Sequence, residues 1–208
     1  MTTGRLEAFS DGVLAIIITI MVLGLAVPQG GSFAAFFSTV GTGLLGYVLS
    51  FAYVGIYWNN HHHMFQVVER VTGPVLWANL HLLFWLSLLP LTTAWLDSTG
   101  LAPAAVIVYG TDLLLCAVAY FLLQSAVLRA EGAGSRLRRL IGRDWKGHLS
   151  PALYAVGIAL GAAAFALPGL AWGSVLIYAG VAVMWIVPDR RIERGVAPYP
   201  PPTERNSP

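Results

Sequence analysis

Charged side chains are scarce in this sequence. Lysine, arginine, aspartate and glutamate make up 11% of its 208 residues, whereas about a quarter of the residues in a soluble domain are charged. Hydrophobic residues make up 57%, and the mean hydropathy is +0.70. The composition therefore excludes a soluble globular domain and predicts an integral membrane protein.

Cysteine is nearly absent, because Cys116 is the only one and lies within an apolar run. An intrachain disulfide is therefore excluded. The histidine run His61–His63 also lacks a cysteine or a Glu-x-x-His partner, and adjacent helical positions point about 100° apart, so the three cannot ligate one ion. We interpret the run as a polar collar at a membrane boundary, where one imidazole can bond Ser10 or Asp11.

A cleavable signal peptide is not expected at the start of the chain. The charged cluster Arg5–Gly12 contains two acids, and no small-residue cleavage site precedes Pro28. The apolar run Leu14–Val27 has Thr19 as its only polar side chain. With the residues before it, the run is long enough to cross a bilayer as a helix of about 20 residues. It is either a simple anchor or a helix that lines a path.

On a helical wheel this first helix has two different sides. One stripe holds Gly12, Ile16, Thr19, Ile20, Leu23 and Val27, and the opposite side holds Glu7, Asp11, Leu14, Ile18 and Leu25. If the first stripe faces an axis, Asp11 faces neighbouring helices. An acid at that depth needs a polar partner, which Arg5, a histidine or backbone N–H groups can supply.

Turn signals divide the rest of the chain into further apolar stretches. The expected spans after the first are Phe33–Trp58, Val75–Trp95, Ala102–Leu128, Leu149–Leu167 and Leu170–Val187. We therefore predict an all-α membrane protein with six transmembrane helices within residues 1–188. Residues 189–208 are rich in proline and are predicted to form a disordered cytoplasmic tail.

Basic residues are confined to one side of this six-span topology. That side carries all 12 of them: Arg5, Arg70, Arg129, Arg136, Arg138, Arg139, Arg143, Lys146, Arg190, Arg191, Arg194 and Arg205. The opposite side has short turns with Asp97 as the only charge. The positive-inside rule then predicts that both termini are cytoplasmic. The basic loop Arg129–Gly147 could bind anionic lipid or nucleic acid, but topogenic charge is the interpretation we favour.

Small residues recur at helical spacing in two of the stretches. They are Ser38, Thr42, Gly46 and Ser50 in the second, and Gly157 and Gly161 in the fifth; both sets favour close helix packing. The segment Thr39–Gly43 is similar to the TVGYG filter of potassium channels. We interpret it as small-residue packing, because it lies within what reads as one uninterrupted helix.

Three polar residues lie inside the predicted spans. Asp112 is a functional candidate by its position, and a structural acid bonded by its neighbours is the alternative. Asn79 and His81 need hydrogen-bond partners within the bundle. No convergent set of nucleophile, base and metal ligands accompanies them, so an enzyme is not expected.

Three segments of the first half together resemble one family. They are Arg5-x-x-x-Phe9-Ser10-Asp11-Gly12 before the apolar run, Trp58-x-x-His61-His62-x-x-Phe65, and Leu76-Trp77-x-Asn79-Leu80 closing at Leu89-Pro90. The family is the transmembrane protein 175 family of endolysosomal potassium channels. The resemblance covers about residues 5 to 93, and the Phe-Ser-Asp motif occurs once, as in the prokaryotic single-repeat form.

The resemblance implies a potassium-permeable channel in the prokaryotic plasma membrane, in which four chains surround one pore lined by the first helix. By motif alignment the constriction falls on Ile16, Ile20 and Leu23, and the hydroxyl linked to selectivity falls on Thr19. Potassium is the permeant ion near Ile16 and Thr19, and no cofactor, other metal or nucleic acid is expected. The implied polar network comprises Arg5, Phe9, Ser10, Asp11, His61, His62, Trp77 and Asn79.

Two other functions stay open from the residues alone. A proton-coupled or other secondary transporter would use Asp11, Asp112 and the histidines as a relay, although internal repeats and broken midplane helices are not evident. A structural or assembly subunit is the second.

Overall fold

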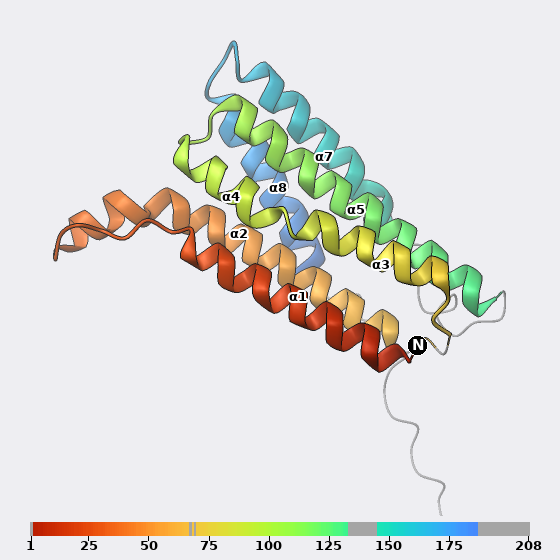
Figure 1. Ribbon diagram of the computed structural model, residues 1–208. Helices are drawn as coiled ribbons and strands as arrows, with labels where there is room; N and C mark the ends of the chain where they lie inside the picture. The colour runs from red at the N-terminus through yellow and green to blue at the C-terminus, as the bar shows by residue number, and fades with distance from the viewer. Residues whose placement is uncertain (1, 67, 69, 133–144, 187–208) are drawn as a thin grey trace, which may run out of the picture.

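The computed structural model describes residues 2–66, 68, 70–132 and 145–186. Its elements are all α-helices (Figure 1): α1 (Thr3–Leu23), α2 (Phe33–Phe65), α3 (Gly73–Leu86), α4 (Leu89–Ser98), α5 (Pro103–Glu131), α7 (Trp145–Ala163) and α8 (Leu170–Ile186). The predicted tail 189–208 and most of the basic loop lie outside the described residues.

Length and composition identify several of these helices as candidate membrane spans. In the described part of the chain, three segments are long and apolar enough to cross a membrane: Thr3–Leu23, the combined segment Gly73–Ser98, and Pro103–Glu131. A fourth is added if the two halves of α2 are one span, and α8 is a shorter apolar helix. The prediction of an all-α membrane protein agrees with this finding, whereas length and composition alone do not establish six spans.

The third apolar stretch is two helices, not the single helix expected for Val75–Trp95. α3 ends at Leu86 and α4 begins at Leu89. The cause is Pro90, which has no N–H to bond the Leu86 carbonyl and whose ring crowds that carbonyl. The Ser87 hydroxyl bonds the Phe84 carbonyl at the break, at 2.7 Å.

The second stretch is bent, which the interpretation as an uninterrupted helix missed. Phe33–Gly41 and Gly43–Phe65 lie at 54° to each other, and Figure 1 shows the first half projecting away from the bundle. Paired glycines are a usual cause of a helix kink. A Cβ at Gly43 would collide with the Asp97 carboxylate on α4, which would then have to move.

α5 is central to the second half of the chain and packs against α3 and α7, which in turn packs against α8. Glycines allow this close approach. A Cβ at Gly110 or at Gly157 would collide with the Tyr178 ring of α8, and Gly161 lies against Val106 and Ile107 of α5. The Tyr178 hydroxyl donates to the Val106 carbonyl at 3.4 Å.

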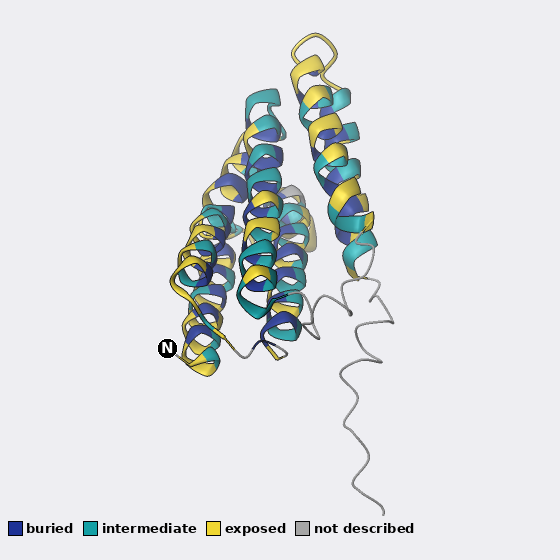
Figure 2. Cartoon of the chain, turned by 90° about the vertical axis from the view of Figure 1, so that its right-hand side faces the viewer, coloured by how far each residue is buried: buried dark blue, intermediate teal, exposed yellow. Residues whose placement is uncertain are grey.

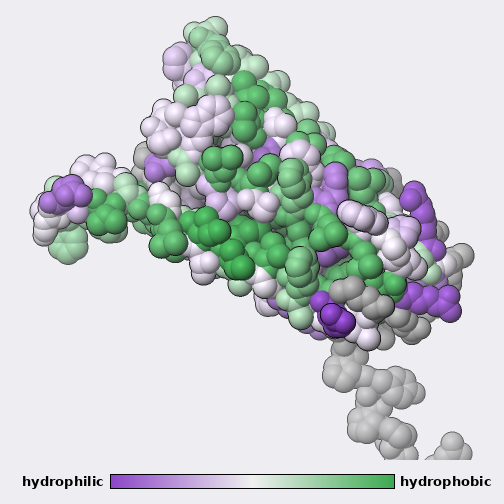
Figure 3. Space-filling model, in the orientation of Figure 1, coloured by the Kyte–Doolittle hydropathy of each residue, from purple (hydrophilic) through white to green (hydrophobic). Residues whose placement is uncertain are grey.

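Burial and hydropathy follow the pattern of a membrane bundle. Buried residues face the interior, and exposed residues form stripes on the outer sides of the helices (Figure 2). Hydrophobic residues form broad patches across the face in Figure 3, and hydrophilic residues gather mainly near its ends. The described basic residues Arg5, Arg129 and Lys146 belong to terminal turns of α1, α5 and α7, and Arg70 to the connection between α2 and α3; these helix ends lie together at the right of Figure 1.

Candidate functional site

α1 presents one buried and one exposed side. The buried row is Leu6, Ser10, Leu14, Ile17 and Met21, which packs onto α2, α3 and α4. The other side exposes Ile16 (58%), Ile20 (51%) and Leu23 (83%), with Gly12 and Thr19 also exposed. A row of large apolar side chains is thus left uncovered by the described residues of one chain.

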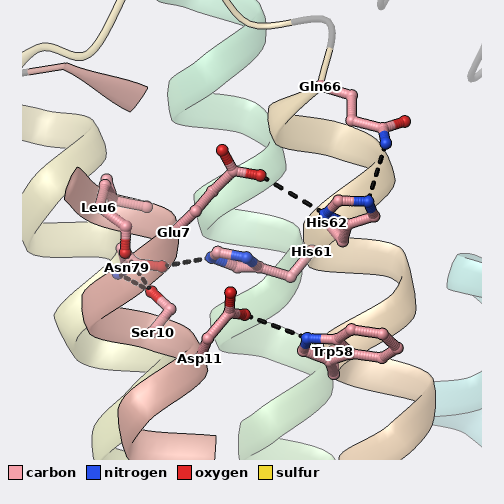
Figure 4. Close-up of polar contacts among 9 residues, drawn as sticks. All are labelled: Leu6, Glu7, Ser10, Asp11, Trp58, His61, His62, Gln66 and Asn79. Carbon is pink, nitrogen blue, oxygen red and sulfur yellow. Dashed lines mark hydrogen bonds and ion pairs between the residues drawn. The ribbon is translucent and has the colours of Figure 1, made fainter. Parts of the chain in front are cut away.

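A buried hydrogen-bond chain joins α1 to α3 and α2 (Figure 4). The Ser10 hydroxyl donates to the Leu6 carbonyl at 2.9 Å and accepts from the Asn79 amide nitrogen at 3.0 Å. The Asn79 carbonyl oxygen lies 2.8 Å from His61 Nε2. Because Asn79 donates to Ser10 through nitrogen, its oxygen accepts, so His61 carries its proton on Nε2. The contact expected between a histidine and Ser10 is therefore made through Asn79.

Asp11 has a partner that the sequence interpretation missed. The Trp58 indole N–H donates to Asp11 Oδ1 at 3.0 Å, at an exposed site between α1 and α2 (Figure 4). One turn away, His62 lies 3.6 Å from Glu7 and also bonds Gln66 at 2.8 Å. A spacing of four residues separates Glu7 from Asp11 and Trp58 from His62, which puts each pair on one helix face. This four-residue spacing is the sequence signal from which the pairing of the two helix faces could have been predicted.

Three residues of the implied network are outside it in the single chain. Phe9 is 53% exposed, Trp77 is 74% exposed, and Arg5 is exposed as well. Within the described residues, no hydrogen bond or ion pair reaches the Arg5 side chain. No group of three His, Cys, Asp or Glu that could hold a metal ion occurs in the part of the chain that the structure describes.

A second polar cluster lies apart from the first, on α2, α4 and α5. The Thr92 hydroxyl donates to Asp112 Oδ2 at 3.0 Å, and Asp112 is almost fully buried. The adjacent Thr93 meets the Ser50 hydroxyl at 2.7 Å, which in turn lies 2.9 Å from the Tyr109 hydroxyl. Within the described residues, no hydrogen bond links this cluster to Asp11 or to the histidines, so Asp112 and Asp11 belong to separate clusters.

Comparisons with known proteins agree on one family. The sequence model of the endosomal/lysosomal potassium channel TMEM175 family matches residues 5–90. A potassium channel of Chryseobacterium sp. (strain P1-3) is 50% identical over 196 residues, covering 94% of this chain and 98% of that protein. The endosomal/lysosomal proton channel TMEM175 of Homo sapiens is 40% identical over 79 residues, 33% of this chain and 16% of that protein.

The fold has a solved counterpart. The crystal structure of a lysosomal potassium-selective channel TMEM175 homologue from Chamaesiphon minutus superposes with a TM-score of 0.62 at 29% identity, covering 94% of this chain and 98% of that one. Full-length similarity to a relative and to this structure, together with the match of the first half, shows that this chain belongs to the TMEM175 family.

Proposed function

We propose that this chain is one subunit of a potassium-permeable channel, and that four copies surround a pore lined by α1. The observation that carries the proposal is the exposed row Ile16, Ile20 and Leu23 on a helix that buries the row Leu6, Ser10, Leu14, Ile17 and Met21 against its neighbours. One helix cannot enclose a lumen, whereas identical copies around a closed symmetry axis can. Conduction of this kind is passive and involves no enzymatic step.

The names of the related proteins support potassium as the permeant ion. The relative that is 50% identical is named a potassium channel, and the similar structure is titled a potassium-selective channel homologue. A transporter that relays protons between Asp11, Asp112 and the histidines is not favoured, since these groups belong to separate clusters.

Ile16 forms the constriction in this proposal. Four isoleucine side chains that meet on an axis exclude water, and a hydrated cation does not pass an apolar ring narrower than its shell. Ile20 and Leu23 form successive rings one and two turns further along the helix. The closed state is then held by hydrophobic contact between copies.

Thr19 is the residue we assign to selectivity. Its hydroxyl donates to the Ile16 carbonyl at 2.9 Å, and a hydroxyl has one donor and two acceptor lone pairs. Because the proton is already used within α1, the oxygen presents only lone pairs to its surroundings. Four such oxygens beside the path can replace part of the hydration shell of potassium.

The polar network positions α1 against α2 and α3. Ser10, Asn79 and His61 connect three helices through two buried hydrogen bonds, and Asp11 with Trp58 adds a third connection near the surface. Phe9 and Trp77 are exposed in the single chain, and we assign them to contacts between copies.

For the membrane topology we propose six spans, counting α3 and α4 as one, with both termini and residues 129–147 in the cytoplasm. The confinement of the basic residues to one side of the sequence topology supports this. Cysteine introduced at Ser135 in a Cys116→Ala background is expected to resist impermeant thiol reagents outside intact cells. Labelling there would contradict the proposed orientation.

The pore assignment is tested by reconstituting wild type, Ile16→Asn and Thr19→Val in planar bilayers. Ile16→Asn is expected to wet the constriction and raise the basal current. Thr19→Val is expected to conduct but to shift the reversal potential under bi-ionic potassium/sodium conditions toward lower potassium preference.

Val118→Asn is the matched control, because Val118 is an exposed apolar residue of α5 and is expected to leave current and reversal potential unchanged. If Ile16→Asn conducts no more than wild type and Thr19→Val leaves the reversal potential unmoved, α1 does not line the pore.

A further inference from the structure

His81 lies on an exposed face of α3, within the candidate membrane span Gly73–Ser98. The Trp85 indole N–H donates to His81 Nε2 at 3.0 Å. Because Nε2 accepts this bond, the imidazole carries its proton on Nδ1. Among the described residues, none accepts a hydrogen bond from Nδ1. Lipid tails offer no acceptor either, so this N–H needs a partner from outside the single chain.

Large apolar side chains surround His81 on the same face of α3. Trp77 is 74% exposed and lies four residues before it, and Phe84 is 55% exposed and lies three residues after it. Spacings of three and four residues put these side chains side by side on a helix. Aromatic residues around a single polar group are typical of the core of a protein–protein interface.

The matching acceptor is Asp11 on α1. Its Oδ1 accepts from the Trp58 indole at 3.0 Å, and its side chain is exposed (Figure 4). Among the described residues, none donates a hydrogen bond to Oδ2. A carboxylate has acceptor sites on both oxygens. A donor from outside the chain can therefore bind Oδ2 while the contact with Trp58 is kept.

The donor and the acceptor lie on opposite flanks of the chain. At 100° per residue, Ser10 points about 120° to one side of Ile16 and Asp11 points about 140° to the other. The first contacts α3 through Asn79, and the second contacts α2 through Trp58. When Ile16 faces a central axis, α3 therefore forms one flank and α2 forms the other.

The donor and the acceptor also lie at similar depth. Asn79 bonds Ser10, which puts these two residues at one level. Asp11 is one residue further along α1 and His81 is two residues further along α3, and the two helices run in the same direction (Figure 1). The difference in depth is about 1.5 Å at the rise of an α-helix. Rotation about an axis along the membrane normal preserves depth, so the two groups can meet between copies.

We propose that the exposed face of α3 docks against the α1–α2 flank of a second copy of this chain. There His81 Nδ1–H donates to Asp11 Oδ2 of the neighbouring copy, with Trp77 and Phe84 packed around the bond. The contact rests on the proposed four-copy assembly and specifies how its copies meet. Each copy offers the donor on one flank and the acceptor on the other, so the contact is head to tail and closes into a ring. A hydrogen bond to a carboxylate is strong and directional, which fixes the orientation of α1 toward the axis.

Cysteine cross-linking in a Cys116→Ala background tests the contact. Chains with Asp11→Cys are co-expressed with chains with His81→Cys that carry a tag of different size, and the purified protein is treated with a short bifunctional methanethiosulfonate. A covalent heterodimer is expected on denaturing gels, whereas neither chain expressed alone is expected to cross-link. Val118→Cys, at an exposed position of α5, replaces His81→Cys as the matched control and is expected to give no heterodimer.

Two substitutions of His81 separate the hydrogen bond from packing. Both His81→Leu and His81→Asn lose the bond from Trp85, but asparagine keeps an N–H donor near the position of Nδ1. At a subunit concentration near the dissociation midpoint, His81→Leu is expected to lower the tetramer fraction in native mass spectrometry several-fold. His81→Asn is expected to retain most of the tetramer.

The outcomes distinguish this contact from the assembly on which it rests. If wild type is a tetramer but the cysteine chains form no heterodimer, or if His81→Leu assembles as fully as His81→Asn, the contact is wrong and the assembly stands. A wild type that stays monomeric overturns the proposed assembly and the contact with it. If the cysteine chains fail to assemble, equal tetramer fractions of the two His81 variants overturn the contact by themselves.

Discussion

The first four helices and the last three are held together in different ways. α1, α2 and α3 meet through buried polar side chains, as in the chain from Ser10 through Asn79 to His61. α5, α7 and α8 meet mainly through glycines, with Gly110 and Gly157 both against Tyr178, and α8 adds hydrogen bonds from Tyr178 to Val106 and from Trp185 to Ser150. Directional hydrogen bonds specify one arrangement, whereas small residues permit close approach. The family match at residues 5–90 falls on the polar half.

The relative positions of the helices are specified most tightly in the polar half. A satisfied buried network tolerates little displacement, because each unpaired group costs a full desolvation penalty. The helix that it supports is the one with the exposed row Ile16, Ile20 and Leu23. The glycine–tyrosine half then forms a scaffold behind it. The following substitutions test that division, beginning with the largest expected effect.

Asn79→Leu removes the centre of the polar half. It leaves His61 Nε2 without its acceptor, at about 1–3 kcal/mol for the unpaired group, and leaves the Ser10 hydroxyl with only its bond to the Leu6 carbonyl. We expect a large fall in the temperature of unfolding and little assembled protein, measured by size-exclusion chromatography after heating in detergent. Asn59→Leu is the control, since Asn59 is exposed on α2 and is expected to behave as wild type. Equal stability of the two variants would contradict the comparison.

Gly157→Ala tests the scaffold half. Its Cβ would meet the Tyr178 ring, and overpacking of this kind typically destabilises by about 1–3 kcal/mol. The lower unfolding temperature is expected without a change in reversal potential. Gly180→Ala on α8 is the matched control, because a Cβ there meets nothing within 4 Å. A shift in ion preference in Gly157→Ala would place function in the scaffold as well.

Asp11→Ala probes the outer edge of the polar half. Asp11 and Trp58 meet at an exposed site, so the lost hydrogen bond is worth about 0.5–1.5 kcal/mol, less than the loss at Asn79. We expect a modest decrease in the tetramer fraction and an unmoved reversal potential. Altered selectivity in a normally assembled variant would put Asp11 in the ion path.

Gly41→Ala has the smallest expected effect. A Cβ at this position meets nothing within 4 Å, and alanine in place of a helical glycine gains up to about 1 kcal/mol. Permeation is expected to stay intact, as the packing interpretation of Thr39–Gly43 requires. Gly43→Ala is the contrasting variant and is expected to lower stability through Asp97. Abolished current in a correctly assembled Gly41→Ala channel would revive the filter interpretation.

Periodicity alone separated the sides of α1, because a 3.6-residue repeat places Ile16 and Ile20 opposite Leu14, and the structure has the former exposed and the latter buried. It did not identify the partner of Asp11, since a wheel gives a direction and not the helix that lies there. Trp58 bonds Asp11 and Asn79 bonds Ser10 only in the folded structure, where α1, α2 and α3 come together.

The residues that interrupt α2 and separate α3 from α4 are recognisable in the sequence, but the geometry that they produce is not. Pro90 was recognised near the end of a span, yet its effect falls four residues earlier, on the Leu86 carbonyl. Gly41 and Gly43 fit both a packing face and a kink, and the structure has both: the helix bends there, and a Cβ at Gly43 would collide with Asp97. That contact joins residues 54 positions apart in the sequence, beyond the reach of any local pattern.

The interruption between α3 and α4 has a mechanical meaning. A continuous helix passes a rotation at one end to the other through its hydrogen-bond ladder, whereas here the ladder is weakened at Ser87 and Leu88, which bond Leu83 and Trp85, because Pro90 has no N–H for the Leu86 carbonyl. Below the break, Asn79 fastens α3 to α1; above it, Thr92 fastens α4 to α5. α3 and α4 are thus attached to different helices on the two sides of a weakened ladder, so we expect a twist of α4 to reach the support of α1 only in part.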